Sequence, residues 1–491
     1  MKSFLKRINW IICLIILYSL IIFLPGFKLF FHQDDFIHLS VSQRFEQVIS
    51  AYNIFQKGEF PFYRPIPTQT YYYFLNSIFG LHPFPFHIIN FIIFSLNIIC
   101  MNKLIRLMSN SKRVGLFASL IYAINSTHVA PLFSPAYVHE LLYVFFGVNT
   151  VYWFIKSLKY SRNYYFLVFL FLIFALMTKE TAVVLPGILI LVSLVYVKKE
   201  KIKSCIATIL SLIGVLSIYL FGHFIYYGLA TGPSYQFSIG KGTINILIWY
   251  FCWALSLPNI LIDYVSPGLK ISNLFFKNAG IYGYISIGSF TLLITGLILF
   301  VLILLYKRFF DKKLINLKYI ILGIGWFIFG MVPLIIFPLH KLATEQAFSL
   351  VGLSFAVSYI LNQIWKINNI GKWLVYFWLI IYLICATNSI LLARKTHWIV
   401  LSSTIAENTF HYLKSIEYKL KPGSVINFTD GLISIPEYGS SRQVYYATGN
   451  GLGIPLLFQR RDFEVYFEDG KPLPFNKKAD IIVDSSTLLG Y

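Results

Sequence analysis

The sequence predicts an α-helical polytopic membrane protein that ends in a small α/β domain outside the membrane. Of its 491 residues, 57% are hydrophobic and only 12% are charged, a composition that excludes an ordinary soluble globular protein. Apolar windows long enough to cross a bilayer recur through residues 1–392. Over residues 393–491, short alternating segments replace them, separated by Gly, Pro and Asp. We therefore expect a membrane domain over residues 1–392 and a small aqueous domain over residues 393–491.

The first apolar window covers residues 8–24 and follows three basic residues, Lys2, Lys6 and Arg7. Basic residues mark the cytoplasmic ends of spans, so the N-terminus is expected in the cytoplasm. The window lacks a small-residue cleavage site, and it is therefore expected to remain as the first span.

Ten further windows are long enough to span and are bounded by charged or turn residues. They cover residues 84–102, 114–131, 138–155, 163–177, 181–197, 204–227, 282–305, 319–338, 346–363 and 373–392. An odd total of eleven spans places the two termini on opposite sides. Residues 244–262 form one more window, but a twelfth span would move the basic residues between Lys307 and Lys318 to the far side. Because this window also contains Pro258, we expect an interfacial or re-entrant segment there.

The distribution of charge supports this topology. Before residue 393, the segments assigned to the cytoplasm carry 21 Lys and Arg residues, and the far-side loops carry nine. The net charge of +21 is therefore explained mostly by membrane orientation, and no nucleic-acid partner is expected. Acidic residues show the opposite bias. Those on or near the far side are Asp34, Asp35, Glu46, Glu59, Glu140, Glu180, Asp263 and Glu345, and only Glu200 and Asp311 fall in cytoplasmic segments.

The cysteines indicate neither a disulfide framework nor a cysteine metal site. All five lie in apolar runs without paired spacing, at Cys13, Cys100, Cys205, Cys252 and Cys385.

The C-terminal segment has the pattern of a small mixed domain. A helical pattern covers residues 402–412 and is broken by Pro422-Gly423. Alternation typical of strands covers residues 424–428, 443–446, 463–467 and 481–483.

The most prominent polar motif is the acidic pair Asp34-Asp35, which lies between His32 and His38 just beyond the first span. Carboxylates near the hydrocarbon boundary are costly and usually functional. The alternative is a pair of solvated loop acids, because the loop is long enough to hydrate both.

Further polar residues recur at the far-side ends of spans. Arg64 precedes an aromatic run at residues 71–74, which an interfacial aromatic belt explains as well as a sugar-binding surface does. His128 fits a hydrogen bond between helices, whereas the pair His139-Glu140 at the start of a span is harder to explain structurally.

Two more clusters complete this set. Lys179-Glu180 lies in a tight connection between two windows, where it forms either a buried salt bridge or an anion site in which Glu180 orients the anion. His340, Lys341 and Glu345 lie at another far-side span end. A ring of such groups, reached from the bilayer, suits a lipid-linked phosphate.

Several motifs follow one another in an order that is more specific than any motif alone. The order is the acidic pair, Tyr63-Arg64-Pro65, Phe79-Gly80, His87, Asn90, Asn97 and the Lys-Glu pair in a short connection. It covers most of residues 1–392 and resembles the glycosyltransferase C (GT-C) superfamily, especially the O-mannosyltransferases that carry tetratricopeptide repeats and their prokaryotic relatives. The resemblance implies a GT-C fold of about 11 transmembrane helices plus interfacial helices.

The chain also departs from the pattern of those relatives. Where they tend to have His-x-Glu and later Gly-Arg-x-Glu, this chain has His128-Val129-Ala130 and Val138-His139-Glu140. Their Glu-Arg-Tyr corresponds here to Glu345-Gln346-Ala347, and the small C-terminal domain stands in place of the repeat array. These departures leave the expected fold unchanged, but they leave the identity of the sugar and of the acceptor open.

The resemblance implies an inverting transfer of a sugar from a polyprenyl phosphate to a hydroxyl of a protein, glycan or lipid, on the exoplasmic face. A lipid phosphate is already a good leaving group, so the reaction needs one general base and cations for the phosphate. The implied base is Asp34, with Asp35 orienting the acceptor or a divalent metal, whose involvement is left open. The residues expected at the donor phosphate are Arg64, Lys179, Glu180, His340 and Lys341. Those expected to contact the substrates are His38, His128, His139, Glu140 and Glu345.

Two other functional classes remain as alternatives. A transporter of a lipid-linked or anionic substrate would also carry charges within its spans, but it would place them at mid-depth and not at one face. A non-catalytic scaffold presenting the C-terminal domain would not require Asp34. The expected location is the cell membrane, with membrane lipids as neighbours and the C-terminal domain exoplasmic.

Overall fold

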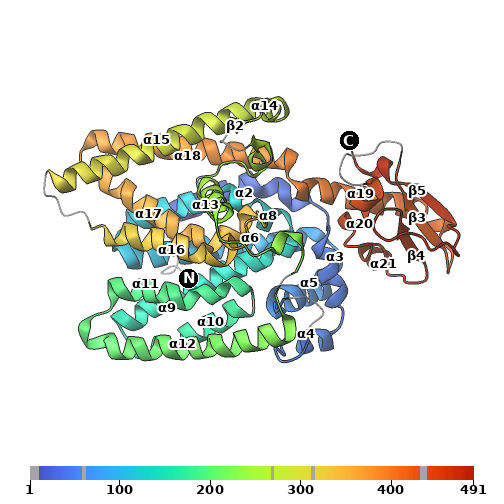
Figure 1. Ribbon diagram of the computed structural model, residues 1–491, viewed down its shortest axis with the longest axis horizontal. Helices are drawn as coiled ribbons and strands as arrows, with labels where there is room; N and C mark the ends of the chain where they lie inside the picture. Colours follow the sequence, from blue (N-terminus) through green and yellow to red (C-terminus); the bar gives the residue numbers. More distant parts are fainter. Residues whose placement is uncertain are drawn as a thin grey trace.

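The computed structural model describes residues 10–57, 62–229, 231–266, 270–310, 316–431 and 439–490. Long helices run side by side in a bundle, and a small domain containing a sheet lies at one end of it (Figure 1). The basic residues before the first window, together with Glu59 and Asp311, lie outside the described residues.

The bundle confirms the prediction of a polytopic helical membrane protein. Within the described ranges, eight helices are long and apolar enough to cross a membrane, and nine if the bent pair Lys112–Ala123 and Ser126–Phe133 counts as one span. The helices of the bundle are α2 (Trp10–Phe23), α6 (Pro83–Ser109), α7 (Lys112–Ala123), α8 (Val129–Phe133), α9 (Val138–Lys159), α10 (Tyr165–Leu176), α11 (Leu185–Tyr196), α12 (Ile202–Gly222), α15 (Ile281–Phe309), α16 (Lys318–Ile335), α17 (Ala347–Trp365) and α18 (Asn369–Thr396).

Every predicted window contains a helix, but two of the apolar helices are shorter than a full span. These are Arg162–Leu176 and Glu180–Tyr196, which meet at the connection containing Lys179. Lys179 is fully buried there, so the chain reverses within the protein and not beyond it. A non-helical connection at this depth is tolerated where protein surrounds it.

Helix α17 is the central helix of the bundle. Nearly all of its residues are buried, and it packs along α16. The two helices approach closely at Gly323 and Gly352, where an added Cβ on Gly323 would lie 2.6 Å from the Gly352 carbonyl oxygen. Small residues permit such close packing between membrane helices.

The ambiguous window at residues 244–262 forms a short helix, α13 (Lys241–Ala254), and then a 3₁₀ turn over Asn259–Tyr264. With 14 residues, α13 is too short for a span, as expected for an interfacial or re-entrant segment. A small hairpin of β1 (Val265–Ser266) and β2 (Lys270–Ile271) and the helix α14 (Asn273–Ala279) lead into α15.

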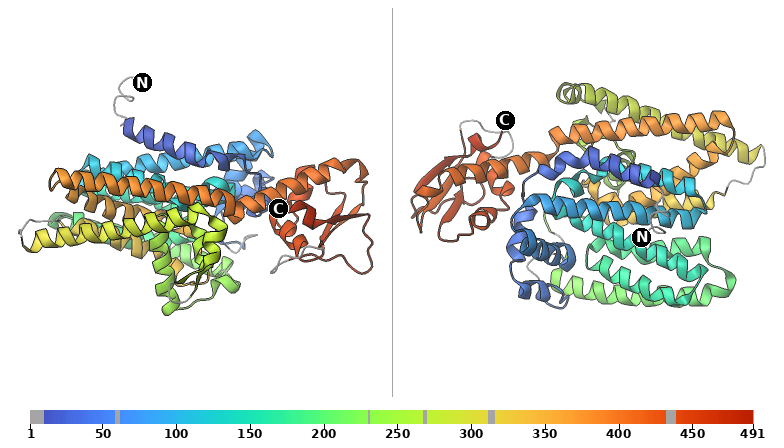
Figure 2. Two further views of the ribbon diagram at one scale, coloured as in Figure 1. Left: turned by 90° about the horizontal axis from the view of Figure 1, so that it is seen from above. Right: turned by 180° about the vertical axis from the view of Figure 1, so that it is seen from behind.

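Three short helices lie at the end of the bundle that bears the C-terminal domain, and α3 lies next to that domain (Figures 1 and 2). They are α3 (Asp34–Val41), α4 (Phe45–Ala51) and α5 (Tyr71–Phe79), and a π-helical turn over Ile66–Thr70 leads into α5. The loop that carries the acidic pair is therefore folded at the end of the bundle that also bears the C-terminal domain.

The C-terminal domain contains a three-stranded parallel sheet in the order β4-β3-β5. Its elements are α19 (Trp398–Ser415), β3 (Val425–Thr429), α20 (Ser440–Ala447), α21 (Gly453–Phe458), β4 (Glu464–Phe467) and β5 (Ile481–Asp484). Three predicted strands and the helix predicted over residues 402–412 are confirmed. The strand predicted at residues 443–446 is wrong, because this stretch belongs to α20.

The burial pattern explains that error. Ser440, Ser441, Val444 and Ala447 are buried, a spacing of three to four residues that matches one face of a helix. Four residues, Gln443 to Tyr446, were too few to distinguish this period from alternation.

A second hydrophobic cluster joins the C-terminal domain to the loop after the first span. Phe31, Phe36 and Leu39 share it with Ile426, Phe467 and other residues of the C-terminal domain. The C-terminal domain thus does not stand apart from the membrane domain but packs directly on the segment that contains Asp34 and Asp35.

Candidate active site

Asp34 is the first residue of α3, and its carboxylate is exposed. No described side chain donates a hydrogen bond to it. Although water reaches the carboxylate, protein surrounds most of it, and this burial raises the pKa of Asp34 above its usual value of 3.8, against the opposing charges of His139 and Arg64. An accessible carboxylate with a raised pKa can accept a proton from a hydroxyl group.

Asp35, the neighbouring residue, is fully buried and fully bonded. Its Oδ1 accepts hydrogen bonds from the Tyr72 hydroxyl at 2.7 Å and from the Ala136 N–H at 2.8 Å, and its Oδ2 accepts one from the His32 N–H at 3.1 Å. Burial raises the pKa of Asp35 to about 7, although these three donors act to lower it. Asp35 thereby ties α3 to α5 and to the 3₁₀ turn Pro135–Tyr137 before α9, and both of its oxygens are engaged by protein donors.

Arg64 and Glu180 form a two-pronged ion pair between the chain before α5 and the connection before α11. The Arg64 Nε donates to both Glu180 oxygens at 3.0 Å, and its second terminal nitrogen lies 2.7 Å from Glu180 Oε2. Both side chains remain partly accessible, at 19% and 26%. Glu180 therefore holds the guanidinium in a fixed orientation, with one terminal nitrogen outside the pair.

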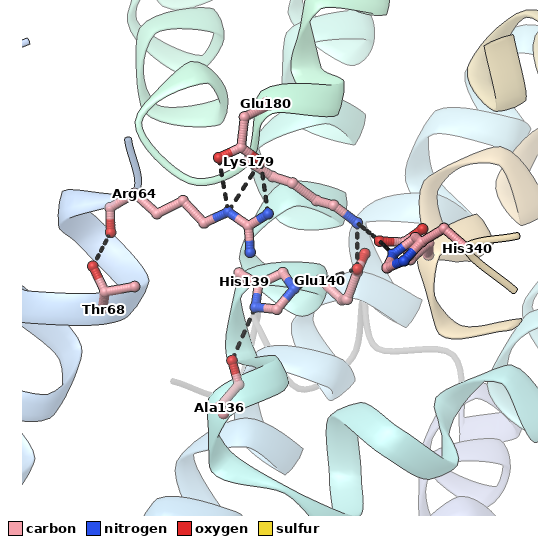
Figure 3. A network of polar contacts seen from close by, with 9 residues as sticks. Arg64, Thr68, Ala136, His139, Glu140, Lys179, Glu180 and His340 are labelled. Atoms are coloured by element: carbon pink, nitrogen blue, oxygen red, sulfur yellow. Dashed lines mark hydrogen bonds and ion pairs between the residues drawn. The ribbon is translucent and has the colours of Figure 1, made fainter. Parts of the chain in front are cut away.

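Lys179 lies in a buried network that joins three segments: its own connection before α11, the first turn of α9, and the segment before α17 (Figure 3). Its ammonium contacts Glu140 and lies 3.9 Å from Glu345, and Glu345 in turn lies 3.2 Å from His340. The Glu140 and Lys179 side chains are almost completely excluded from solvent. One oxygen each of Glu140 and Glu345 has no hydrogen-bond partner among the described residues. The two carboxylates neutralise the charge of Lys179. Lys179 thus forms a buried salt bridge with Glu140, and its neighbour Glu180 pairs with Arg64.

His139 connects this network to the acidic pair through one residue, Ala136. Its Nδ1 donates to the Ala136 carbonyl oxygen at 2.9 Å, and its Nε2 lies 3.4 Å from Glu140. The N–H of the same Ala136 donates to Asp35. Residues from five separate segments are thus held in one chain of contacts, as Figure 3 shows for the part around His139.

Two of the predicted site residues, His128 and Lys341, lie apart from this network, and a third, His38, is enclosed beside it. His128 is fully buried, its Nε2 donates to the Tyr122 carbonyl oxygen at 2.9 Å, and its ring packs on Phe94 and Tyr122. These are the contacts of a packed side chain, and the expected contact of His128 with substrate stays a prediction.

His38 lies beside the network, and Lys341 lies apart from it. His38 is buried on α3 with its ring 5.2 Å from that of Tyr72, and burial lowers the pKa of His38 to about 3. It therefore stays neutral and is enclosed. Lys341 is exposed and lines a separate pocket.

Two pockets include residues of the site. One of about 160 Å³ is lined by Arg64 together with Gln47, Tyr63 and Tyr227. The other, of about 270 Å³, is lined by Tyr137, Lys341, His397 and Trp398 among others. The Tyr137 ring is 5.5 Å from that of His139, which brings the second pocket close to the network.

Tyr72, Tyr137 and the C-terminal domain were not identified from the sequence as parts of the site. Tyr72 belongs to the aromatic run that an interfacial belt explained equally well, yet it is fully buried and bonded to Asp35. The aromatic run itself was the sequence signal for Tyr72, but the sequence could not show which of its rings is buried. No such signal pointed to Tyr137 or to the C-terminal domain.

A divalent metal does not fit the residues that the structure describes. They contain no group of three or more His, Cys, Asp or Glu side chains arranged to hold a metal ion. Asp35, the expected metal or acceptor ligand, has its oxygens engaged by protein donors.

No protein-family model and no curated protein matches this chain. Among solved structures, the chain is similar to the Archaeoglobus fulgidus oligosaccharyltransferase in its apo form, with a TM-score of 0.47 and 13% identity over 95% of this chain and 64% of that one. A second structure is the AglB oligosaccharyltransferase of the same organism with an inhibitory peptide and a dolichol-phosphate, with a TM-score of 0.46 and 12% identity over 92% of this chain and 64% of that one. A third is ArnT from Cupriavidus metallidurans bound to undecaprenyl phosphate, with a TM-score of 0.45 and 12% identity over 93% of this chain and 85% of that one. The chain thus spans less than two thirds of the archaeal enzymes, and no activity or substrate transfers to it from these similarities.

Proposed function

We propose that this protein is an integral-membrane inverting glycosyltransferase of the GT-C type. It moves a sugar from a polyprenyl phosphate to a hydroxyl acceptor on the exoplasmic face, with Asp34 as the general base. The observation that carries the proposal is the contrast between the two acids of the pair. Asp34 is exposed and unbonded to described side chains, whereas Asp35 is buried and accepts three hydrogen bonds.

The proposed reaction is a single displacement. Asp34 takes the proton of the acceptor hydroxyl, the acceptor oxygen bonds to the anomeric carbon, and the bond from that carbon to the phosphate oxygen breaks. The phosphate leaves with the electron pair, so cations near it stabilise the transition state. Inversion follows because the acceptor and the phosphate occupy opposite faces of the sugar.

Arg64 and Lys341 are the two candidate cations for the phosphate, one in each pocket, so the donor phosphate lies in one pocket or the other. Arg64 lines one pocket and keeps a terminal nitrogen outside its pair with Glu180, and Lys341 is exposed in the other. Lys179 has its charge neutralised by Glu140 and Glu345. In this proposal Lys179 and Glu180 serve the donor indirectly, by positioning the network and Arg64, and His139 and His340 contact the substrates.

A transporter of a lipid-linked substrate remains the rival. It would use the same charged network for passage and would not need Asp34 to accept a proton. A variant that lacks the Asp34 base but still binds the donor separates the two: the enzyme would lose glycosyl transfer, and the transporter would keep its activity.

The test is glycosyl transfer by the purified protein from a panel of polyprenyl-phosphate monosaccharides. Asp34→Asn is nearly isosteric but cannot take the proton, so its rate is expected to fall by roughly 100-fold or more while donor binding persists. Glu46→Gln is the matched control, because Glu46 is an exposed acid in the same region of the chain and should keep the full rate.

The wild-type rate should also depend on pH. Because the pKa of Asp34 is raised, the base becomes protonated, and the rate falls, at a pH above that expected for an ordinary Asp. Full activity of Asp34→Asn, or the absence of transfer from every donor in the panel, would contradict the proposed function.

A further inference from the structure

The C-terminal domain rests on α3 through a glycine turn, Gly449 to Gly453, between α20 and α21. Gly449 has φ of +62°, and an added Cβ there would lie 2.7 Å from both the Gln33 carbonyl oxygen and Phe36 Cβ. At Gly453 an added Cβ would lie 2.6 Å from the Phe36 ring, which is fully buried. These two glycines leave room for α3 that no other residue would leave.

The residue held by this turn is the one immediately before Asp34. Gln33 has φ of +45° and ψ of −117°, a backbone conformation that residues other than glycine rarely adopt. Such strain persists only where the surroundings enforce it. Here the Gln33 N–H donates to the Ala447 carbonyl oxygen at 2.9 Å, at the end of α20.

Contacts on both sides of the acidic pair reinforce the same attachment. Before it, the Phe30 N–H donates to the Ser403 hydroxyl at 2.7 Å, and the Phe30 ring stacks on Phe410 at 5.6 Å. After it, Arg461 donates to the Gln43 side chain at 2.9 Å. The segment on either side of Asp34 is therefore anchored to the C-terminal domain.

We propose that the glycine turn of the C-terminal domain positions Asp34 for the reaction, so that the domain is part of the active-site framework and not an appended module. This inference rests on the proposed function for its catalytic consequence. Gly449, Gly453 and Ala447 act through Gln33 and Phe36, and they are positioning residues that touch no substrate.

The first measurement is kcat and donor KM for three glycine variants. Gly449→Ala and Gly453→Ala should lower kcat by roughly 10- to 100-fold with donor KM within about twofold, the effect of displacing a base by about 1 Å. Gly451→Ala is the control, because Gly451 lies in the same turn with φ of +80° and an added Cβ there meets only Phe467 of the C-terminal domain. Its kcat should stay near that of wild type.

A compensating change tests whether the contact with Phe36 is the cause. Phe36→Leu gives the Gly453→Ala methyl group space, so the double variant should recover kcat relative to Gly453→Ala alone. Gly453 does not have a positive φ, so alanine at this position brings no backbone strain of its own. The Gly453→Ala and Phe36→Leu variants therefore decide the proposal even if Gly449→Ala fails to fold.

The second measurement does not depend on glycosyl transfer. In an Asp34→Cys background, the rate of alkylation of the new thiol by a small maleimide reports where that side chain lies. The rate should change severalfold in Gly449→Ala and Gly453→Ala and stay constant in Gly451→Ala.

The two readouts keep the two ideas apart. If Asp34→Asn is fully active, the proposed function fails, and alkylation still decides whether the turn positions residue 34. If Asp34→Asn is inactive but Gly449→Ala and Gly453→Ala match wild type in kcat and alkylation, only the positioning role is overturned. Equal losses in Gly451→Ala and Gly453→Ala would also overturn it, since general destabilisation of the domain would then explain the effect.

Discussion

Lys179 is the residue at which burial and charge conflict most strongly. Its side chain is 2% exposed and meets Glu140, which is fully excluded from solvent. Breaking a buried ion pair by removing one partner leaves an uncompensated charge, at a cost of roughly 3–5 kcal/mol. Replacing both partners by neutral groups of similar shape is often nearly neutral.

This predicts a specific pattern of thermal stability. Lys179→Met should lower the unfolding temperature clearly, and Lys179→Met combined with Glu140→Gln should recover most of the loss, as measured by thermal unfolding in detergent. Lys341→Met is the control, because Lys341 is exposed and its removal should leave stability unchanged. If Lys179→Met unfolds like wild type but binds donor weakly, Lys179 contacts the donor directly and the salt-bridge reading is wrong.

Asp34 and Asp35 illustrate how far a sequence can define a site. The pair was identifiable from its position after the first span, as were Arg64, Glu140, Lys179 and Glu345. The sequence did not show which of the two acids faces solvent. Successive residues of a helix point about 100° apart, and only the packing of α3 determines which side is covered. The sequence already favoured a structural hydrogen bond for His128 over His139, and the tertiary contacts show which groups the two rings meet.

At the scale of elements, the bend between α7 and α8 has an identifiable cause. Helix α7 ends at Ala123, and the Tyr122 carbonyl oxygen accepts a hydrogen bond from His128 within the bend. Asn125 reinforces the bend by donating to the Ala254 carbonyl oxygen at 2.9 Å. The polar groups released by the break are thus satisfied inside the protein, as membrane helices require.

His128→Ala should therefore weaken the fold and not the chemistry. Loss of the bond to a buried carbonyl is expected to cost about 1–3 kcal/mol, visible as a lower unfolding temperature, with donor KM unchanged. His411→Ala is the control, since His411 is exposed on α19. A large rise in donor KM without a change in stability would instead return His128 to the substrate site.

Elements differed in how well the sequence predicted them. Long apolar helices such as α6 and α15 were evident, because hydrophobic length alone identifies them. Helix α20 was not, since the eight residues Ser440–Ala447 bury only a narrow face. The packing of α20 and α21 against α3 joins segments about 400 residues apart, and no local pattern encodes such a contact.

At the scale of the whole molecule, the acidic pair and the C-terminal domain lie at the same end, joined by the second hydrophobic cluster. The side of the membrane on which this end lies is still a prediction, and it follows from the bias of basic residues toward the opposite segments. Ser42 and Ser485 lie at this end of the molecule but are buried, so exposed positions near them suit labelling.

Cysteine labelling tests the orientation. In a variant without the five native cysteines, Ser50→Cys and Thr487→Cys should react with an impermeant maleimide on intact cells, because both positions are exposed at the end with the C-terminal domain. Ser161→Cys, exposed between α9 and α10, should react only after the membrane is permeabilised. Labelling in the reverse pattern would place the site in the cytoplasm and contradict the proposed exoplasmic reaction.

Helix α19 also determines the distance of the C-terminal domain from the bundle and its rotation about the helix axis. It follows α18 after a single extended residue, His397, with φ of −73° and ψ of 133°. Each residue added to a helix advances it by about 1.5 Å and turns it by about 100°. One residue inserted into α19 would rotate the glycine turn away from α3. Seven inserted residues would nearly restore its orientation about the helix axis but displace it along that axis by about 10 Å. The number of residues in α19 is therefore as much a determinant of the site as any side chain within it, and natural variation in chain length should avoid this helix.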